Sequence, residues 1–94
     1  MIIRWTEEAH VNLEDIVDQA FHRDPLEASN ISKRIEIAEK NILLFPKAAL
    51  YNSEHDYYER YVPRTRVILV YRVTGETITV YRAFHTSRDP KDKA

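Results

Sequence analysis

The sequence predicts an α+β domain in which a two-helix hairpin packs on one face of a small, mostly antiparallel sheet. Apolar residues recur at helical spacing through two consecutive segments of the first half of the chain. Two runs rich in β-branched residues follow in the second half, joined by a tight turn that contains the single glycine. A length of 94 residues suits one domain and leaves no room for a second, so we expect residues 1–94 to fold as one unit.

A short strand is expected first, at Ile2–Trp5, followed by a helix over residues 7–22. Thr6 can cap this helix, and Glu7 and Glu8 occupy its first turn, where the helix dipole favours negative charge. The helix is amphipathic, because its apolar residues recur on one face while polar residues separate them. That face consists of Ala9, Leu13, Ile16, Val17, Ala20 and Phe21.

The second helix is expected over residues 25–44. Asp24 can cap it, and Pro25 takes the first helical position, where its missing N–H costs little. Phe45 precedes Pro46 and therefore ends the helix. The short connection between the two helices predicts an antiparallel hairpin. The main apolar stripe of the second helix consists of Ile31, Ile35, Ala38 and Ile42.

The second half of the chain predicts three strands after an irregular segment. Residues 46–57 show no periodic pattern, and a strand over 58–62 ends at Pro63. Two longer strands, 66–73 and 77–84, then form a hairpin around a turn that contains glycine. The predicted order of elements is therefore β-α-α-β-β-β.

If the last two strands pair in a regular hairpin ladder, each of their residues can be assigned to one of the two faces of the sheet. The pairs of this ladder are Val73 with Ile78, Tyr71 with Val80, Leu69 with Arg82, and Val67 with Phe84. We expect this side to lie against the helices, where Arg82 either extends its charged end to solvent or pairs with an acidic helix residue such as Asp15 or Asp18. The opposite side is too apolar to face only solvent and too polar to form a second core. We therefore expect either a partner or a bend of the sheet to cover part of it. It carries Arg66, Ile68, Val70, Arg72, Thr77, Thr79, Tyr81, Ala83 and His85.

The net charge of −1 conceals an uneven distribution. Residues 1–56 hold six Lys/Arg against eleven Asp/Glu, whereas residues 57–94 hold eight against four. All six tyrosines lie from Tyr51 onward. The basic half can present an anion-binding surface, or the acidic residues simply solvate the helices while tyrosine favours strands.

Several classes of protein are disfavoured. With no cysteine, the chain has neither disulfides nor a thiolate metal site, and its four histidines lack the spacing of a zinc site. We expect no metal and no cofactor. No apolar run approaches the ~18 residues of a membrane span. Glu7 and Glu8 interrupt any signal sequence, so we expect a cytoplasmic protein without membrane contact.

Two motifs and the order of elements carry a family likeness. The strand 69–73 (LVYRV) and the ending 81–89 (YRAFHTSRD) resemble the RelE/ParE toxins of type II toxin–antitoxin pairs, and look most like the ParE-type branch. The spacing from Ala9 to Ile16 and the run at 44–46 (LFP) also fit. The resemblance covers nearly the whole chain.

The resemblance implies a growth-inhibiting toxin, of the kind tied to plasmid stabilisation, that a cognate antitoxin neutralises. ParE-type members poison DNA gyrase, and RelE-type members cut mRNA on the ribosome. In the RelE-type branch, an arginine is expected at the position of Ile68 and a tyrosine is expected beyond Arg88. This chain has isoleucine at the first position, and no tyrosine follows Tyr81. We therefore expect a gyrase-binding toxin that is not an enzyme. The alternatives are a ribosome-dependent endoribonuclease and an inactive homologue that only binds its antitoxin.

The candidate residues depend on this choice. In a nuclease, His85 and Arg88 are the catalytic candidates, because an imidazole can exchange a proton near neutrality and an arginine stabilises phosphate charge. Alternatively, His85 is structural and bonds a backbone carbonyl. The chain could assemble as a homodimer or as a hetero-oligomer with the antitoxin. The candidates for binding the target or the antitoxin are Arg60, Arg66, Ile68, Val70, Arg72, Tyr81 and Arg88.

Overall fold

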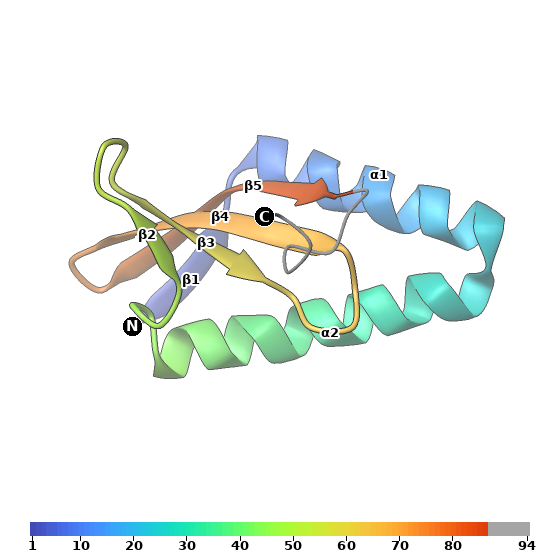
Figure 1. The fold of residues 1–94 in the computed structure, drawn as a ribbon, viewed down its shortest axis with the longest axis horizontal. Coiled ribbons are helices and arrows are strands. Elements are labelled where there is room, and N and C mark those ends of the chain that lie inside the picture. Colours follow the sequence, from blue (N-terminus) through green and yellow to red (C-terminus); the bar gives the residue numbers. More distant parts are fainter. Residues whose placement is uncertain (87–94) are drawn as a thin grey trace, which may run out of the picture.

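Two helices and a five-stranded sheet make up the computed structural model, which describes residues 1–86 (Figure 1). The α+β class and the expected order of helices and strands are confirmed, with one additional strand. The elements are β1 (Ile2–Trp5), α1 (Glu7–Arg23), α2 (Pro25–Leu44), β2 (Leu50–Asn52), β3 (Tyr57–Tyr61), β4 (Val67–Thr74) and β5 (Thr77–His85).

Side-chain caps begin both helices, as the sequence predicts. The Thr6 hydroxyl accepts a hydrogen bond from the Ala9 amide at 3.1 Å, and the Asp24 carboxylate accepts one from the Leu26 amide at 3.0 Å. Each bond satisfies a backbone donor that has no partner within the helix. Because Asp24 both ends α1 and caps α2, the connection is very short, and the two helices form a hairpin (Figure 1).

The sheet has the strand order β1-β5-β4-β3-β2. β1 runs parallel to β5, and the other neighbouring strands are antiparallel. The prediction that residues 46–57 are irregular is wrong at β2, which pairs with β3. Three residues at a sheet edge are too few to show a period-2 pattern. The Asn52 side chain stabilises the turn after β2 by accepting bonds from the amides of Glu54 and His55.

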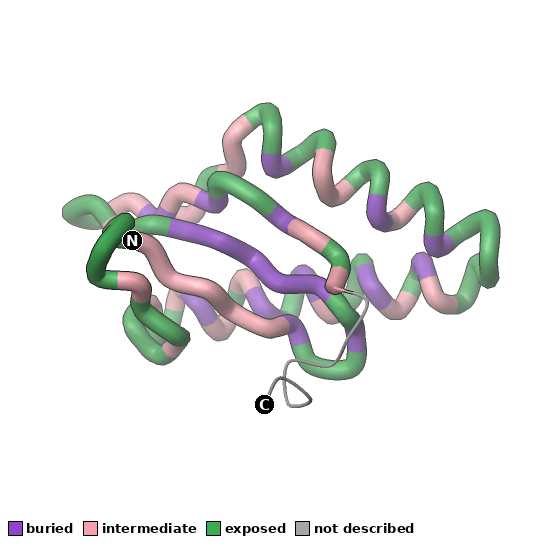
Figure 2. Tube along the Cα trace, turned by 45° about the horizontal axis from the view of Figure 1, so that its top comes forward, coloured by how far each residue is buried: buried purple, intermediate pink, exposed green. Residues whose placement is uncertain are grey.

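The hydrophobic core lies between the helix hairpin and one face of the sheet. The apolar stripes of both helices pack there against β4 and β5, with Ile35, Leu69 and Tyr71 in one buried cluster and Leu13 beside it. Figure 2 shows β4 buried along much of its length between more exposed strands. Tyr71 is fully buried, and its hydroxyl donates to the Pro46 carbonyl at 2.8 Å. The helices therefore cover the side of the sheet that carries Leu69 and Tyr71, as predicted.

A β-bulge changes the register halfway along the β4–β5 hairpin. The two predicted pairs nearest the turn are confirmed, and Tyr71 pairs with Val80 in the second of them. The next pair joins Val70 to Arg82, so Tyr81 is an extra residue on β5. Beyond this point every residue of β5 is displaced by one position from the regular ladder.

The two predicted pairs beyond the bulge are therefore wrong. Leu69 pairs with Ala83 in place of Arg82, and Val67 pairs with His85 in place of Phe84. Ala83 and His85, which the regular ladder assigns to the outer side, consequently lie on the helix side of the sheet.

The bulge has a clear physical advantage. A regular ladder would place Arg82 opposite Leu69, beneath the helices, where an unpaired charge is costly. The extra residue puts the small Ala83 there instead, and Ala83 is only 4% exposed. The expected pairing of Arg82 with Asp15 or Asp18 is wrong as well, because Arg82 is exposed and its guanidinium lies over the ring of a neighbour on the outer side, Phe84.

Candidate functional site

The side of the sheet away from the helices carries a groove with a volume of about 370 Å³. We call this region the outer surface, and its residues come from β3, β4 and β5. The position of each residue follows from strand alternation and from the bulge, which brings two consecutive residues of β5 to the same side. The outer surface consists of Tyr57, Glu59, Val70, Arg72, Tyr81, Arg82 and Phe84.

Two arginine–aromatic contacts shape the outer surface. The Arg72 guanidinium carbon lies 5.2 Å from the centre of the Tyr81 ring, and that of Arg82 lies 5.6 Å from the centre of the Phe84 ring. Both distances are within the range of a cation–π interaction. The groove thus presents guanidinium groups and aromatic rings side by side.

Backbone carbonyls hold Arg72 in place. Its Nε donates to the Asp56 carbonyl and its Nη2 to the His55 carbonyl, both at 3.1 Å. These two carbonyls belong to the turn between β2 and β3, so the arginine joins that turn to β4. An arginine fixed in this way loses little conformational entropy when it binds a partner. Arg and Tyr are also the residue types that most often dominate the energetics of protein interfaces.

The structure brings together only some of the residues predicted to bind a partner. Val70, Arg72 and Tyr81 all lie in the groove, and Ile68 lies two residues before Val70 on the same face of β4. Arg60 lies on the helix side instead, where its Nη1 donates to the Ala48 carbonyl at 3.1 Å. This placement follows from the register, because Arg60 pairs with the core residue Leu69.

Two further candidates do not belong to the groove. Arg66 precedes β4 and lines a different cavity, which also contains His85. Arg88 lies outside the described residues. Among residues 1–86, no group of three or more His, Cys, Asp and Glu side chains could hold a metal ion. No helix in the same range is long and apolar enough to cross a membrane.

Four residues of the groove are not among those predicted from the sequence. Tyr57 and Glu59 belong to β3. The sequence does not assign the faces of this strand, because it does not show which strands pair with it. A regular ladder assigns Arg82 and Phe84 to the helix side, and the bulge moves both to the outer side. The signal that could have revealed the bulge is the charge of Arg82, which a regular ladder would bury.

His85 lies on the other side of the sheet from this groove. It pairs with Val67 and faces the helices, near Arg23 and Glu27. Burial lowers the pKa of His85 below its usual value, and the nearby charge of Arg23 lowers it further. His85 and Arg82 therefore lie on opposite sides of β5.

The fold and the groove define a small α+β domain with a two-helix hairpin on a five-stranded sheet. Residues 3–90 match the family described as "ParE toxin of type II toxin-antitoxin system, parDE". The chain belongs to this family and is the toxin component of a type II toxin–antitoxin pair. This finding confirms the resemblance to the RelE/ParE superfamily and to its ParE branch.

A solved structure has the same fold. A chain from the "Chromosomal ParDE TA system from P. aeruginosa" is 22% identical, with a TM-score of 0.79. The match covers 93% of this chain and 97% of that one. No curated protein sequence matches the chain.

Proposed function

We propose that this toxin acts by binding DNA gyrase through the outer surface, without chemistry of its own, and that a cognate antitoxin neutralises it. The observation that supports this proposal best is the groove with its two arginine–aromatic contacts. It suits a protein partner, because it combines apolar area with charged groups in fixed positions. The site of action would be the cytoplasm, where gyrase works.

The residue at one position of β4 supports binding rather than cleavage. Metal-free RNA cleavage needs cations placed around the phosphate. A buried isoleucine, Ile68, occupies the position where the RelE-type branch has an arginine. The binding-type toxin is thus preferred to the endoribonuclease.

A supercoiling assay tests the proposal. Purified protein is added to gyrase and relaxed plasmid, and we expect it to inhibit supercoiling while leaving ribosome-bound mRNA intact. The concentration of the Arg82→Ala variant that gives half-inhibition should be about tenfold higher than that of the wild type. This is the effect expected when a residue that contributes strongly to binding is truncated. Arg4→Ala is the matched control, since Arg4 is an exposed arginine on β1, outside the groove.

Three outcomes would contradict the proposal. Unchanged supercoiling at high protein concentration would exclude gyrase as the target. Cleavage of mRNA that is lost in His85→Ala would establish the endoribonuclease instead. Normal growth when the toxin is expressed without its antitoxin would indicate an inactive homologue.

We propose that the antitoxin covers the same outer surface, so that toxin bound to it cannot reach gyrase. An acidic segment of the antitoxin would complement Arg72 and Arg82 and could fold as it binds. Adding the antitoxin should restore supercoiling, and its affinity for Arg82→Ala should fall while its affinity for Arg4→Ala should not. If Arg82→Ala binds the antitoxin as tightly as the wild type does, the antitoxin occupies another face.

A further inference from the structure

A row of three residues crosses the outer surface from β3 to β5. Glu59 on β3 pairs with Val70 on β4, and Val70 pairs with Arg82 on β5. All three line the groove, and Glu59 is the acidic residue among those that form it. The row therefore presents a carboxylate and a guanidinium on either side of an apolar residue.

The two charges in this row are separated from each other. Neighbouring strands lie about 4.8 Å apart, so the Cα atoms of Glu59 and Arg82, which are two strands apart, are roughly 10 Å from each other. Within residues 1–86, neither side chain forms an ion pair. Val70 between them is only 8% exposed, as expected for the floor of a groove. A ligand that spans the row would thus meet a negative group, an apolar floor and a positive group in that order.

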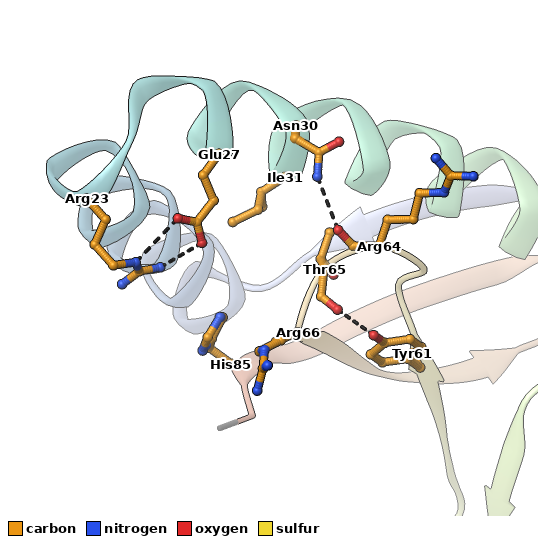
Figure 3. A pocket seen from close by; sticks show the side chains of 9 residues that line it. All are labelled: Arg23, Glu27, Asn30, Ile31, Tyr61, Arg64, Thr65, Arg66 and His85. Carbon is orange, nitrogen blue, oxygen red and sulfur yellow. Dashed lines mark hydrogen bonds and ion pairs between the residues drawn. The ribbon is translucent and has the colours of Figure 1, made fainter. Parts of the chain in front are cut away.

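Glu59 differs in this respect from Glu27, a half-buried carboxylate in a second cavity of about 550 Å³ beside the helix hairpin. Both Glu27 oxygens accept hydrogen bonds from Arg23, Oε1 at 3.0 Å and Oε2 at 3.4 Å (Figure 3). The Glu59 carboxylate is half-buried too, but no hydrogen bond or ion pair within the described part of the chain reaches it. Partial burial of a carboxylate without a partner is unfavourable. The fold itself therefore gives no reason for a charge at this position, whereas a bound partner would.

Arg82 has hydrogen-bond donors to offer at the other end of the row. Its guanidinium carbon lies over the face of the Phe84 ring, 5.6 Å from the ring centre, and within residues 1–86 the side chain donates to no acceptor. A contact of this kind leaves the N–H groups in the guanidinium plane free to bind a carboxylate. Arg72, by contrast, already donates from Nε and Nη2 to the β2–β3 turn. Of the two arginines, Arg82 therefore has more donors available for a partner.

We propose that the gyrase segment that enters the groove places a basic side chain on Glu59, an apolar side chain on Val70 and an acidic side chain on Arg82. This inference rests on the proposed binding of gyrase through the outer surface. Glu59 is the specificity-determining residue, because a carboxylate attracts a basic group and repels an acidic one. A nucleic acid has a uniformly negative backbone, so Glu59 disfavours it even though arginines and aromatic rings line the same groove.

Substitution of Glu59 distinguishes the two kinds of ligand by the sign of its effect. Removal of the charge should weaken the binding of a segment that offers a basic side chain, and should strengthen the binding of a ligand that is negative throughout. Glu59→Gln keeps the size of the side chain and removes its charge, and Glu59→Lys reverses the charge. Glu36→Gln is the matched control, because Glu36 is exposed on α2, and the helices cover the opposite side of the sheet from the groove.

Direct binding to purified gyrase in the absence of DNA tests the proposal. Dissociation constants are measured for the wild type and the three variants, and in parallel for a single-stranded oligonucleotide. We expect Glu59→Gln to bind gyrase about fivefold more weakly, the upper end of the effect of an ion pair that is partly exposed to solvent. Glu59→Lys should bind it more weakly still, and Glu36→Gln should bind it as the wild type does. In urea unfolding, Glu59→Gln should be at least as stable as the wild type, because an amide costs less to bury than a carboxylate.

Several results would overturn this role of Glu59. An unchanged affinity in Glu59→Gln would show that no basic group meets the carboxylate, while weaker binding by Arg82→Ala would leave the gyrase proposal intact. Tighter binding by Glu59→Gln, or saturable oligonucleotide binding by the wild type, would identify a polyanion as the ligand. A lower stability of Glu59→Gln would assign the residue a structural role instead. If the wild type does not bind gyrase at all, the proposed function and the role of Glu59 both fail.

Discussion

The two faces of β4 are both buried, but by different means. Leu69 faces the helices and is fully buried in the core, whereas its neighbour Ile68 faces outward and is 9% exposed. On the outer face, Ile68 lies between Tyr61 and Phe84 of the adjacent strands. Secondary structure therefore covers one face, and individual side chains cover the other.

Because of this difference, we expect the helix side to determine stability and the outer face to determine binding. The helix side is enclosed by backbone elements that can move away only if the domain unfolds. The side chains on the outer face can change rotamer without loss of the fold, and a partner could replace part of their cover. We expect substitutions on the helix side to change the free energy of unfolding and those on the outer face to change affinity.

The largest expected effect is that of Leu69→Ala, compared with Ile68→Ala. Truncation of a fully buried leucine costs about 2–5 kcal/mol, and we expect the upper half of that range for Leu69. Ile68→Ala should cost about 2 kcal/mol or less, because the flanking aromatic rings can close over the gap. Urea unfolding measures both values. Equal losses would show that the outer face is a second core.

Removal of one buried hydroxyl should have a smaller effect. Tyr71→Phe keeps the ring in the core but leaves the Pro46 carbonyl without its 2.8 Å hydrogen bond. We expect a loss of about 1 kcal/mol in the free energy of unfolding, the usual net value of one hydrogen bond. Thermal unfolding of the variant beside the wild type measures it. An unchanged melting temperature would mean that the bond is replaced by water.

On the outer face, Arg82→Ala should leave stability almost unchanged. Arg82 is exposed, and substitutions at such positions usually shift the free energy of unfolding by no more than about 0.5 kcal/mol. The same variant should lose activity in the supercoiling assay. If it instead unfolds at much lower urea concentration, the arginine supports the bulge, and its effect on inhibition could not be assigned to binding.

The smallest expected effect is a dependence on pH. The pKa of His85 is lowered in the folded state, so the unfolded chain binds more protons between the two pKa values. Stability should therefore be intact above about pH 6.5, the usual pKa of histidine, and should fall as the pH drops through the folded-state value. The His85→Gln variant should lose less stability than the wild type between about pH 7.5 and about pH 5, because it lacks the imidazole that the unfolded chain protonates near pH 6.5. A wild type that loses no more than the variant would contradict the lowered pKa.

The helices and the core can be predicted well from the sequence, because their signals are local. The caps at Thr6 and Asp24 and the apolar stripes of the helices are visible in short windows, and the structure confirms them. The first two pairs of the β4–β5 hairpin are also predictable, since they depend only on the turn at Gly75.

The outer surface is only partly predictable, because it depends on the bulge. Strand alternation assumes one residue on β5 for each residue on β4, and Tyr81 breaks that rule. The choice between a regular and a bulged ladder is made by the cost of placing Arg82 under the helices, which is a tertiary effect. The predicted faces of Arg82, Phe84 and His85 are all wrong for this single reason. The short strand β2 has no signal of its own and gains its order from pairing with β3.

The parallel pairing of β1 with β5 has a consequence for how the chain folds. Ile3 pairs with Ile78, so the first strand cannot join the sheet until the last one has formed. Closing so long a loop is slow, and contacts between residues far apart in sequence generally delay folding. During synthesis the helix hairpin can form early, while its apolar stripes stay uncovered until β5 leaves the ribosome. A ribosome stalled before β5 would thus display an incomplete, aggregation-prone domain, a natural substrate for chaperones and proteases.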